Sequence, residues 1–223
     1  SRRAAPTPAT GSNSCTTTRA STAGSRSRRP RSFPGSTEPR CPVESSLSRA
    51  REGQGRAGSD RFLSGLAYLD GITPSAIYGR GYYERTAFAA YSLVNGELQE
   101  VWTFDSDEAG RGKSLGNHNL AIGDLDNDGF DEIVAGSLTL DHDGTILYAM
   151  DGEMGRVKGS HGDALHVGAF DPNREGLHVF GVHEEPEVAS LEYHDGATGE
   201  TIQAFYAYKD TGRGVAANIT SSP

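Results

Sequence analysis

The sequence predicts an all-β fold, a partial β-propeller of about three blades. Three observations predict it. Apolar strand-like segments recur every 45 to 56 residues, hairpin signals follow within two of the repeated units, and no segment sustains the 3.6-residue period of an amphipathic helix. A spacing near 50 residues is typical of a four-stranded propeller blade.

Residues 1–58 differ in composition from the rest of the chain. They contain 11 Arg, no Lys and three Glu, a net charge of +8, which leaves −17 for residues 59–223. Phe33 is their only aromatic residue, so they cannot bury enough apolar surface to offset the entropy of ordering. We expect a disordered segment rich in Arg, Ser, Pro and Gly, which reads like an out-of-frame translation. The incomplete propeller domain is expected over 59–223.

Composition also excludes several classes of function. The Arg-Ser clusters have no interleaved aromatic residues for base stacking, so we expect no nucleic-acid partner. No apolar run approaches the roughly 20 residues that span a bilayer, so we expect no membrane partner. Both cysteines, Cys15 and Cys41, lie before residue 59, which leaves the predicted domain without a disulfide framework or a thiolate metal site. The oligomeric state stays open.

The repeat emerges when apolar strands that end in a turn residue are aligned. Leu69, Leu125, Phe170 and Ile219 become equivalent, each in the first strand of a unit. The chain then contains three units and the opening strand of a fourth, at Val215–Ile219. Because propellers usually close with four to eight blades, we expect the chain to be a fragment.

Two predicted hairpins support the units. In Ala90–Trp102 the dipeptide Asn95-Gly96 separates two alternating segments, a strong signal for a type I′ turn. The second hairpin is predicted over Leu191–Phe205.

The acidic loop, residues 124–132, is predicted to bind calcium between two strands. Hard cations prefer oxygen ligands, and alternate residues of an extended loop can turn inward while Gly129 permits a sharp bend. The expected ligands are four side chains and one carbonyl: Asp124, Asp126, Asp128 and Glu132, with the carbonyl of Phe130. A solvated acidic turn is the alternative, but it leaves like charges to repel without a cation.

An EF-hand is excluded for this loop. Its twelfth position, which needs a bidentate Glu, is Ala135, and the residues that follow are β-branched and interrupted by Gly136 rather than helical.

Polar residues recur at one register of the repeat. Seven residues before each aligned position stand Phe62, His118, Asp163 and Gly212, flanked by further polar and glycine residues such as His161 and Arg213. In a propeller these positions share one rim of the central channel, so they are expected to form one cleft. Imidazoles, a carboxylate and a guanidinium there suit an anionic sugar such as a uronate. Elimination on a uronate needs its carboxylate neutralised and a base near working pH.

The ordered motifs resemble those of the rhamnogalacturonan lyases of polysaccharide lyase family 11, over about residues 59–219. The motifs are Asp60-Arg61-Phe62-Leu63, Ala67-Tyr68-Leu69-Asp70-Gly71, Arg80-Gly81-Tyr82-Tyr83, Trp102-Thr103-Phe104-Asp105-Ser106, Gly116-Asn117-His118-Asn119, Asp141-His142-Asp143-Gly144, His161-Gly162-Asp163-Ala164-Leu165-His166 and Gly212-Arg213-Gly214. The resemblance implies an eight-bladed propeller, several bound Ca²⁺ ions, secretion, and β-elimination of the rhamnogalacturonan I backbone of pectin.

Carried over by residue, the resemblance implies a catalytic set of His118, His161, Asp163 and Arg213, with Asn117, Asn119 and Arg213 contacting substrate. Calcium is expected at the acidic loop, at Asp163 and at a second loop through Asp171 and Asn173. Either histidine can be base or metal ligand. His142 and Asp143 fit a further calcium loop or a plain turn, and His183-Glu184 is interpreted as structural. Two rival hypotheses are a non-catalytic calcium-stabilised propeller for carbohydrate binding or adhesion, and an inactive truncated fragment.

Overall fold

The structure, a computed structural model, describes residues 62–219. The predicted disordered segment 1–58 and the motif residues Asp60 and Arg61 lie outside the described residues. Within 62–219 the fold is β-rich, with one single-turn helix, α3 (Ser106–Ala109), so the all-β prediction is confirmed. No helix of the described part is long and apolar enough to cross a membrane.

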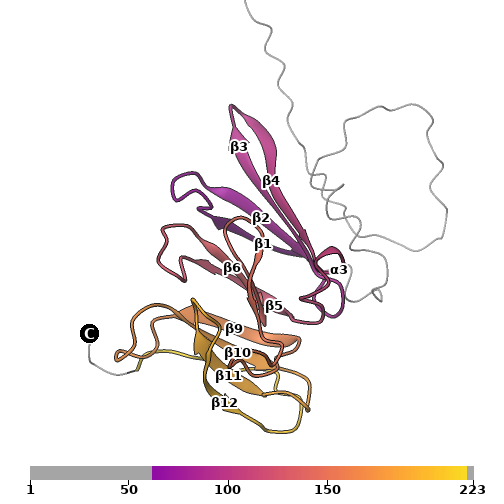
Figure 1. The fold of residues 1–223 in the computed structure, drawn as a ribbon, viewed down its shortest axis with the longest axis vertical. Helices are drawn as coiled ribbons and strands as arrows, with labels where there is room; N and C mark the ends of the chain where they lie inside the picture. The colour runs from indigo at the N-terminus through magenta and orange to yellow at the C-terminus, as the bar shows by residue number, and fades with distance from the viewer. Residues whose placement is uncertain (1–61, 220–223) are drawn as a thin grey trace, which may run out of the picture. The chain divides into compact units, whose positions relative to one another are not determined.

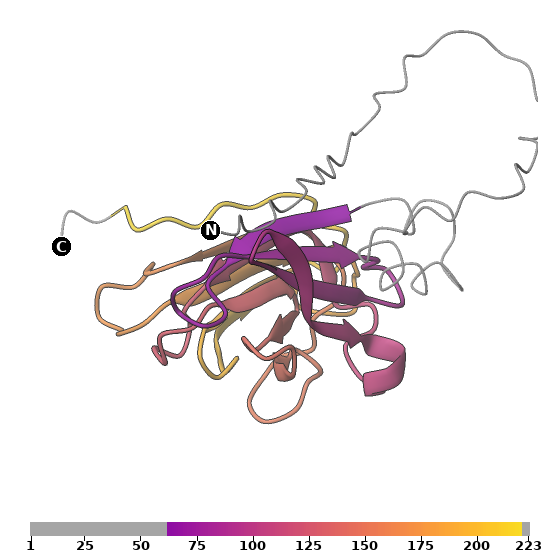
Figure 2. The ribbon, with the colours of Figure 1, turned by 90° about the horizontal axis from the view of Figure 1, so that it is seen from above.

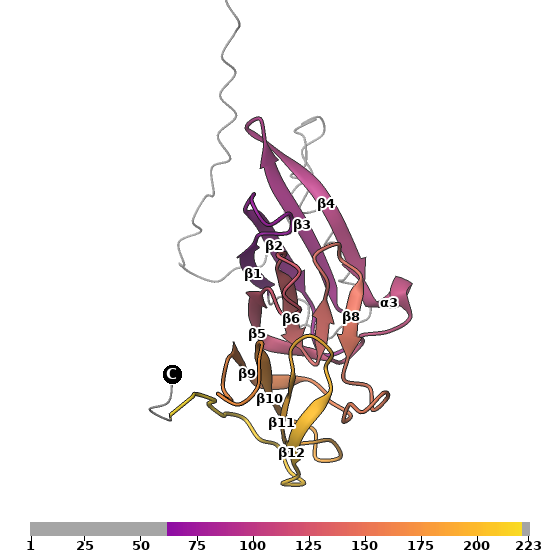
Figure 3. The same ribbon diagram turned by 60° about the vertical axis from the view of Figure 1, so that its left-hand side comes forward.

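Twelve strands form three four-stranded antiparallel meanders, which follow one another along the chain from indigo to yellow in Figure 1 and Figure 3. Meander I contains β1 (Phe62–Ala67), β2 (Ser75–Arg80), β3 (Ala87–Val94) and β4 (Glu97–Asp105). Meander II contains β5 (Gly116–Gly123), β6 (Glu132–Gly136), β7 (Leu138–Leu140) and β8 (Ile146–Ala149). Meander III contains β9 (Gly162–Gly168), β10 (His178–His183), β11 (Leu191–Asp195) and β12 (Thr201–Phe205).

Both predicted hairpins are present. Asn95 and Gly96 join β3 to β4 with φ values of 53° and 85°, the positive pair that a type I′ turn requires. The chain turns between β11 and β12 at residues 196–200.

The meanders pack against one another through apolar faces. The core between meanders I and II includes Ile77, Phe88, Ile133 and Leu138, all at most 1% exposed. A second core between meanders II and III contains Leu125, Val134, Leu165 and Val179. Burial of these side chains is the main driving force for the packing.

The first strands of meanders II and III lie side by side. They are joined by one parallel pair, Asn117 with Gly162, which links the two meanders into an eight-stranded sheet. This pairing brings the beginnings of β5 and β9 to the same place, as the repeat register predicted.

The strand predicted at Val215–Ile219 is not formed. Residues 211–219 have no regular structure, and Figure 2 shows this yellow segment as an extended stretch without a strand. Val215 is 82% exposed and Ile219 is 93% exposed. A β-strand needs a neighbouring strand for its backbone hydrogen bonds, and the strand pairings within residues 62–219 do not include this segment.

Candidate functional site

Four ionisable side chains meet where β5 and β9 begin, and we name them the histidine cluster: His118, His161, Asp163 and Glu184. Each offers one ligand atom, and these atoms all lie within 4.8 Å of one another. Two of the four come from β5 and β9 themselves, His161 directly precedes β9, and Glu184 directly follows β10. The antiparallel pairing of β9 with β10, which matches Gly162 with His183, explains why Glu184 returns to this end.

Glycines permit the close approach of these strands. A Cβ added at Gly162 would lie 1.9 Å from the carbonyl oxygen of Val182, and one at Gly116 would lie 2.3 Å from Cβ of Tyr82. Real Cβ atoms do not approach other atoms this closely, so any side chain at either position would push the strands apart. The glycines that flank the predicted site residues are therefore needed for the close strand packing that forms the site.

Asp163 connects His118 to Arg213. Its Oδ1 lies 3.0 Å from Nδ1 of His118, and its Oδ2 lies 3.1 Å from Nη1 of Arg213. The same Nη1 donates to the backbone carbonyl of Asp163 at 3.0 Å. The side chain of Arg213 is 74% exposed, so the guanidinium is oriented by Asp163 and still faces solvent. Three of the predicted catalytic residues thus form one connected group.

His161 presents an unused lone pair to the cluster. Its Nδ1 lies 2.9 Å from the carbonyl oxygen of Gly116, which can only accept, so Nδ1 carries the hydrogen and Nε2 does not. Nε2 is buried without a hydrogen-bond partner and lies 3.8 Å from Oε1 of Glu184. Burial, followed by the charge of nearby His118, lowers the pKa of His161 to about 4. The imidazole is therefore neutral at neutral pH.

Glu184 is the cluster member that the sequence analysis missed, because it was interpreted as structural. Burial and then the charge of Asp163 raise the pKa of its carboxyl, and Arg213 opposes this. Its backbone N–H donates to the carbonyl of His161 at 3.1 Å. The orphaned nitrogen of His161 and two crowded carboxylates are a donor set that fits a divalent cation.

Two tyrosines form an aromatic wall beside the imidazoles. The ring of Tyr82 stacks on His161 at a centroid distance of 4.9 Å and an angle of 16°. The ring of Tyr83 lies 4.2 Å from His161, and its hydroxyl is 3.5 Å from Nε2 of His118. Both tyrosines belong to a motif of the sequence analysis but were not predicted to be site residues.

The two asparagines beside His118 differ in their surroundings. Asn117 is 1% exposed, and its amide donates to the carbonyl of Ala164 at 3.3 Å and accepts from the backbone of Asn119 at 2.9 Å. Through the bond to Ala164, Asn117 links β5 to β9. Asn119 is exposed. Contact of either asparagine with substrate stays a prediction. Phe62, which stands at the same register of the repeat, has its ring under the guanidinium of Arg80.

The acidic loop joins β5 to β6, as predicted, and its geometry fits a cation. Asp124 and Glu132 each have one buried carboxylate oxygen without a hydrogen-bond partner, Oδ1 and Oε1 respectively. Asp124, Asp126 and Glu132 place oxygens within 4.8 Å of one another. Burial, and then the charges of Asp126 and Asp128, raise the pKa of Glu132 to about 7. A hard cation would satisfy the two orphaned oxygens and offset this repulsion.

The loop also contacts both neighbouring meanders. Asp131 accepts a hydrogen bond at 2.7 Å from the backbone N–H of Tyr68, which follows β1. Leu125 packs in the core between meanders II and III, and its N–H donates to Glu132 at 2.6 Å. Phe130, predicted to contribute a carbonyl, has its ring 4.6 Å from that of His142, at a tilt of 36°. The acidic loop is therefore placed to hold three meanders together.

The other predicted calcium positions are less complete. Asp143 accepts from Thr145 in a turn between β7 and β8, as a plain turn would. His142, in contrast, has its ligand atom within 4.8 Å of those of Asp128 and Glu132. Asp171 accepts from the backbone of Asn173 at 2.9 Å and belongs to none of the ligand groups found among residues 62–219. Calcium at Asp171 and Asn173 stays a prediction.

The family described as "Rhamnogalacturonan lyase family 11, C-terminal domain" matches residues 50–223 of this chain. The chain belongs to this family. The match begins within the segment predicted to be disordered and covers every residue of the histidine cluster and the acidic loop.

Two relatives from Bacillus subtilis (strain 168) agree with this assignment. The chain is 49% identical over 163 residues to rhamnogalacturonan endolyase YesW, covering 72% of this chain and 25% of the relative. It is 48% identical over 166 residues to rhamnogalacturonan exolyase YesX, covering 73% and 26%. The chain therefore spans about a quarter of the length of the curated relatives it matches.

Solved structures of the family have the same fold. The crystal structure of the exotype lyase YesX matches with a TM-score of 0.67 at 44% identity, over 77% of this chain and 28% of that one. The Bacillus licheniformis rhamnogalacturonan lyase matches with a TM-score of 0.68 at 43% identity, over 77% and 29%.

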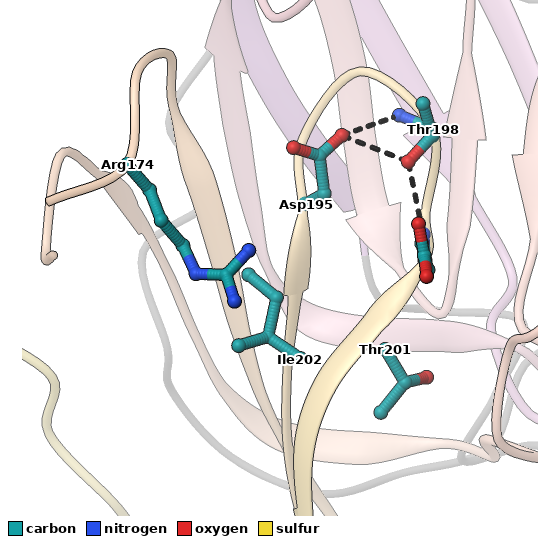
Figure 4. Close-up of a pocket in the computed structure, with 6 residues that line it drawn as sticks. Arg174, Asp195, Thr198, Thr201 and Ile202 are labelled. Carbon is teal, nitrogen blue, oxygen red and sulfur yellow. Dashed lines mark hydrogen bonds between the residues drawn. The ribbon is translucent and has the colours of Figure 1, made fainter.

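This family 11 chain also has a polar hollow in meander III, beside the β11–β12 turn. It has a volume of about 260 Å³ and is shown in Figure 4, where Asp195 accepts from Thr198 at the β11–β12 turn. None of the predicted catalytic residues lines it; the lining residues are Arg174, Asp195, Thr198, Glu200, Thr201 and Ile202.

Proposed function

We propose that this chain is part of a calcium-dependent polysaccharide lyase that cleaves the rhamnogalacturonan I backbone of pectin by β-elimination at galacturonate. The observation that carries the proposal is the pairing of Arg213 with Asp163, a member of the histidine cluster that forms where β5 and β9 begin. The names of the relatives support the substrate, because both are rhamnogalacturonan lyases.

The elimination breaks two bonds of the galacturonate. A base takes the ring proton beside the carboxylate, the electron pair forms a carbon–carbon double bond, and the glycosidic oxygen on the next carbon leaves and is protonated. The ring proton becomes acidic enough only if the carboxylate charge is neutralised. Arg213, exposed and oriented by Asp163, supplies a planar donor pair that matches a carboxylate.

The histidine cluster would hold the cation of this proposal through its imidazole and carboxylate atoms. A bound Ca²⁺ would add a second positive charge to neutralise and polarise the substrate carboxylate. Of the two imidazoles, one is the proposed proton acceptor, because a ring nitrogen that binds the cation cannot also take the proton. His161 is neutral because burial lowers its pKa, and His118 is the more accessible, with 21% of its side chain exposed against 5% for His161.

Three further properties belong to the proposal. The acidic loop binds a Ca²⁺ that stabilises the packing of the meanders, and the three meanders are blades of an eight-bladed propeller. The protein is secreted, since its proposed substrate is a polymer too large to enter a cell. The two orphaned oxygens of Asp124 and Glu132 support the first of these.

The test is production of unsaturated uronide, followed by its ultraviolet absorbance, with rhamnogalacturonan as substrate. Because the chain matches only a quarter of its relatives, two proteins are assayed: residues 1–223, and YesW with its matched segment replaced by that of this chain. We expect the chimera to form product, to lose activity with a chelator and to regain it with Ca²⁺. An inactive chimera beside an active YesW parent would overturn the lyase proposal, and activity indifferent to chelator would overturn the calcium role.

The rival hypothesis is a non-catalytic propeller that binds carbohydrate. It predicts binding of rhamnogalacturonan by the chimera without any product. Replacement of Arg213 by Ala distinguishes the two, since it should abolish product formation in a lyase while leaving the melting temperature of the chimera within about 2 °C, as expected for an exposed side chain.

A further inference from the structure

A second group of ionisable residues lies wholly inside meander III. His194, Glu192 and His183 are all at most 1% exposed, and none of them has a part in the reaction proposed above. Taking a carboxylate out of water costs several kcal/mol unless it is paired. The burial of this group therefore requires a structural or functional explanation.

The three side chains form a chain of contacts that begins at Tyr148. The hydroxyl of Tyr148 lies 3.1 Å from Nε2 of His194, whose Nδ1 lies 2.5 Å from Oε2 of Glu192. The other oxygen of Glu192, Oε1, faces Nε2 of His183 at 3.8 Å. Neither of these last two atoms has a hydrogen-bond partner among the described residues. In the tautomer that carries its hydrogen on Nε2, His183 directs that hydrogen at the carboxylate and leaves Nδ1 to accept from the N–H of Ser160.

The surroundings keep Glu192 ionised and close to His183. Burial acts to raise the pKa of Glu192, but the imidazoles of His194 and His183 outweigh it and lower that pKa. Gly181 stands opposite Glu192 on β10. A Cβ there would lie 2.6 Å from Oε1 of Glu192 and 3.3 Å from Nε2 of His183, so glycine leaves the room that the pair needs.

The far side of His183 contacts the backbone that carries the histidine cluster. Its Nδ1 lies 3.0 Å from the carbonyl oxygen of Ser160 and 3.4 Å from the N–H of Ser160. The hydroxyl of Ser160 donates to the carbonyl of His161 at 3.1 Å. The residue after His183 is Glu184, whose N–H donates to the same carbonyl of His161. His183 therefore contacts the backbone of Ser160, which precedes His161, and is followed along the chain by Glu184.

We propose that Glu192 is a positioning residue for the histidine cluster: it fixes the ring of His183, which holds the Ser160–His161 backbone and Glu184 in place. The inference rests on the proposed function for the role of the cluster as a cation site. Glu192 itself touches neither cation nor substrate. Residues that orient metal ligands from outside typically change metal affinity by about 10- to 100-fold.

The test compares Glu192→Gln with Tyr148→Phe in the full chain. Hydrogen exchange of the Ser160 amide and the imidazole NMR signals of His161 are measured without metal, and calcium affinity by calorimetry. Gln keeps the volume of Glu192 but not its charge, so we expect faster exchange at Ser160, shifted His161 signals and about 10-fold or more weaker binding of Ca²⁺. Tyr148→Phe removes a hydroxyl four contacts away from Ser160 and should change none of these.

Gly181→Ala is the second variant, for the case that Glu192→Gln does not fold. Its methyl group wedges between Glu192 and His183 without removing a charge, and it should reproduce the effects on Ser160 and His161. Glu192→Asp, which keeps the charge, should restore part of the affinity. Unchanged Ser160 exchange and His161 signals in folded Glu192→Gln or Gly181→Ala would overturn the positioning role. A wild-type chain that binds no Ca²⁺ would instead contradict the proposed function, and the NMR comparison would still decide the positioning role.

Discussion

The histidine cluster and the acidic loop both bring carboxylates together, yet their surroundings are opposite. In the histidine cluster, imidazoles and tyrosine rings stand beside Asp163 and Glu184, and an arginine that is 74% exposed opens toward solvent. In the acidic loop the oxygens are bound largely by the loop's own backbone. Asp128 accepts from Phe130, and Asp124 accepts from Gly129.

This difference in surroundings indicates a different role for each region. A loop whose carboxylates are already oriented by backbone N–H groups gains stability from a cation but has no neutral base and no free cation of its own to offer a substrate. The histidine cluster has a neutral imidazole, His161, and an accessible guanidinium, Arg213. We therefore expect loss of the first region to reduce stability and loss of the second to reduce turnover.

The largest expected effect is that of Asp163→Asn in the YesW chimera. Asn is the same size, but it cannot hold the charges of both His118 and Arg213. Loss of one preorganised charged group at a reacting centre commonly lowers kcat by about 10²–10³. We expect a loss of this size in product formation, with the melting temperature changed by less than about 3 °C. A large drop in melting temperature with preserved specific activity would reverse the contrast between the two regions.

Glu132→Gln should act in the opposite sense, on stability rather than on turnover. Gln can still accept from the N–H of Leu125 but removes the buried charge that a cation would need. A ligand at about 100 times its dissociation constant stabilises the folded state by about 2.7 kcal/mol. In the chimera that carries Glu132→Gln, Ca²⁺ should no longer stabilise the folded state by this amount. The measurement is the rise in melting temperature that Ca²⁺ produces. If the rise persists, Glu132 is not a ligand.

The same variant has a pH signature in metal-free protein. The folded-state pKa of Glu132, raised to about 7 by burial, lies above its ordinary value of 4.5. Its contribution to stability is therefore fully present below about pH 4.5 and is lost as the pH rises through about 7. Chelated wild type should lose stability to denaturant over this range, and the Gln variant should lose less.

Much of the fold and of both regions was predictable from local sequence. Asn95-Gly96 specified its turn, and the glycine and aspartate spacing specified a loop between strands. The repeat register placed His118 and Asp163 together because parallel pairing of β5 and β9 preserves that register. These features depend on short-range chemistry or on a regular repeat.

The features that the sequence could not predict depend on how later strands pair with earlier ones, including irregularities in that pairing. Glu184 follows β10, so its position depends on how β10 pairs with β9, including a register shift between Val182 and His183. The strand predicted at Val215–Ile219 failed for a related reason, since an apolar stretch becomes a strand only where a partner edge is available. Asn117, which is buried, lies in a stretch where the pairing of β5 with β6 is irregular, between Gly116 and Ala121.

Gly116→Ala tests whether the construction of the histidine cluster can be disturbed without touching its chemistry. The added Cβ would lie 2.3 Å from Cβ of Tyr82 and 2.7 Å from its Cα. Overpacking of this kind typically costs about 1–3 kcal/mol. We expect a drop in the free energy of unfolding of that size together with weaker turnover, because Gly116 also accepts from His161. Gly96→Ala in the exposed β3–β4 turn is the matched control, which should cost stability alone.

The smallest effect should come from Tyr83→Phe, which removes one hydroxyl from the aromatic wall. That hydroxyl lies 3.5 Å from Nε2 of His118, too long for a strong hydrogen bond, whereas the ring contact with His161 at 4.2 Å is kept. A neutral hydrogen bond contributes about 0.5–1.5 kcal/mol at most, and a long one less. We expect kcat to fall less than about five-fold, which corresponds to under 1 kcal/mol, with KM and melting temperature unchanged. A loss as large as that of Asp163→Asn would mean that Tyr83 takes part in proton transfer, and the aromatic wall would then belong to the reacting groups of the site.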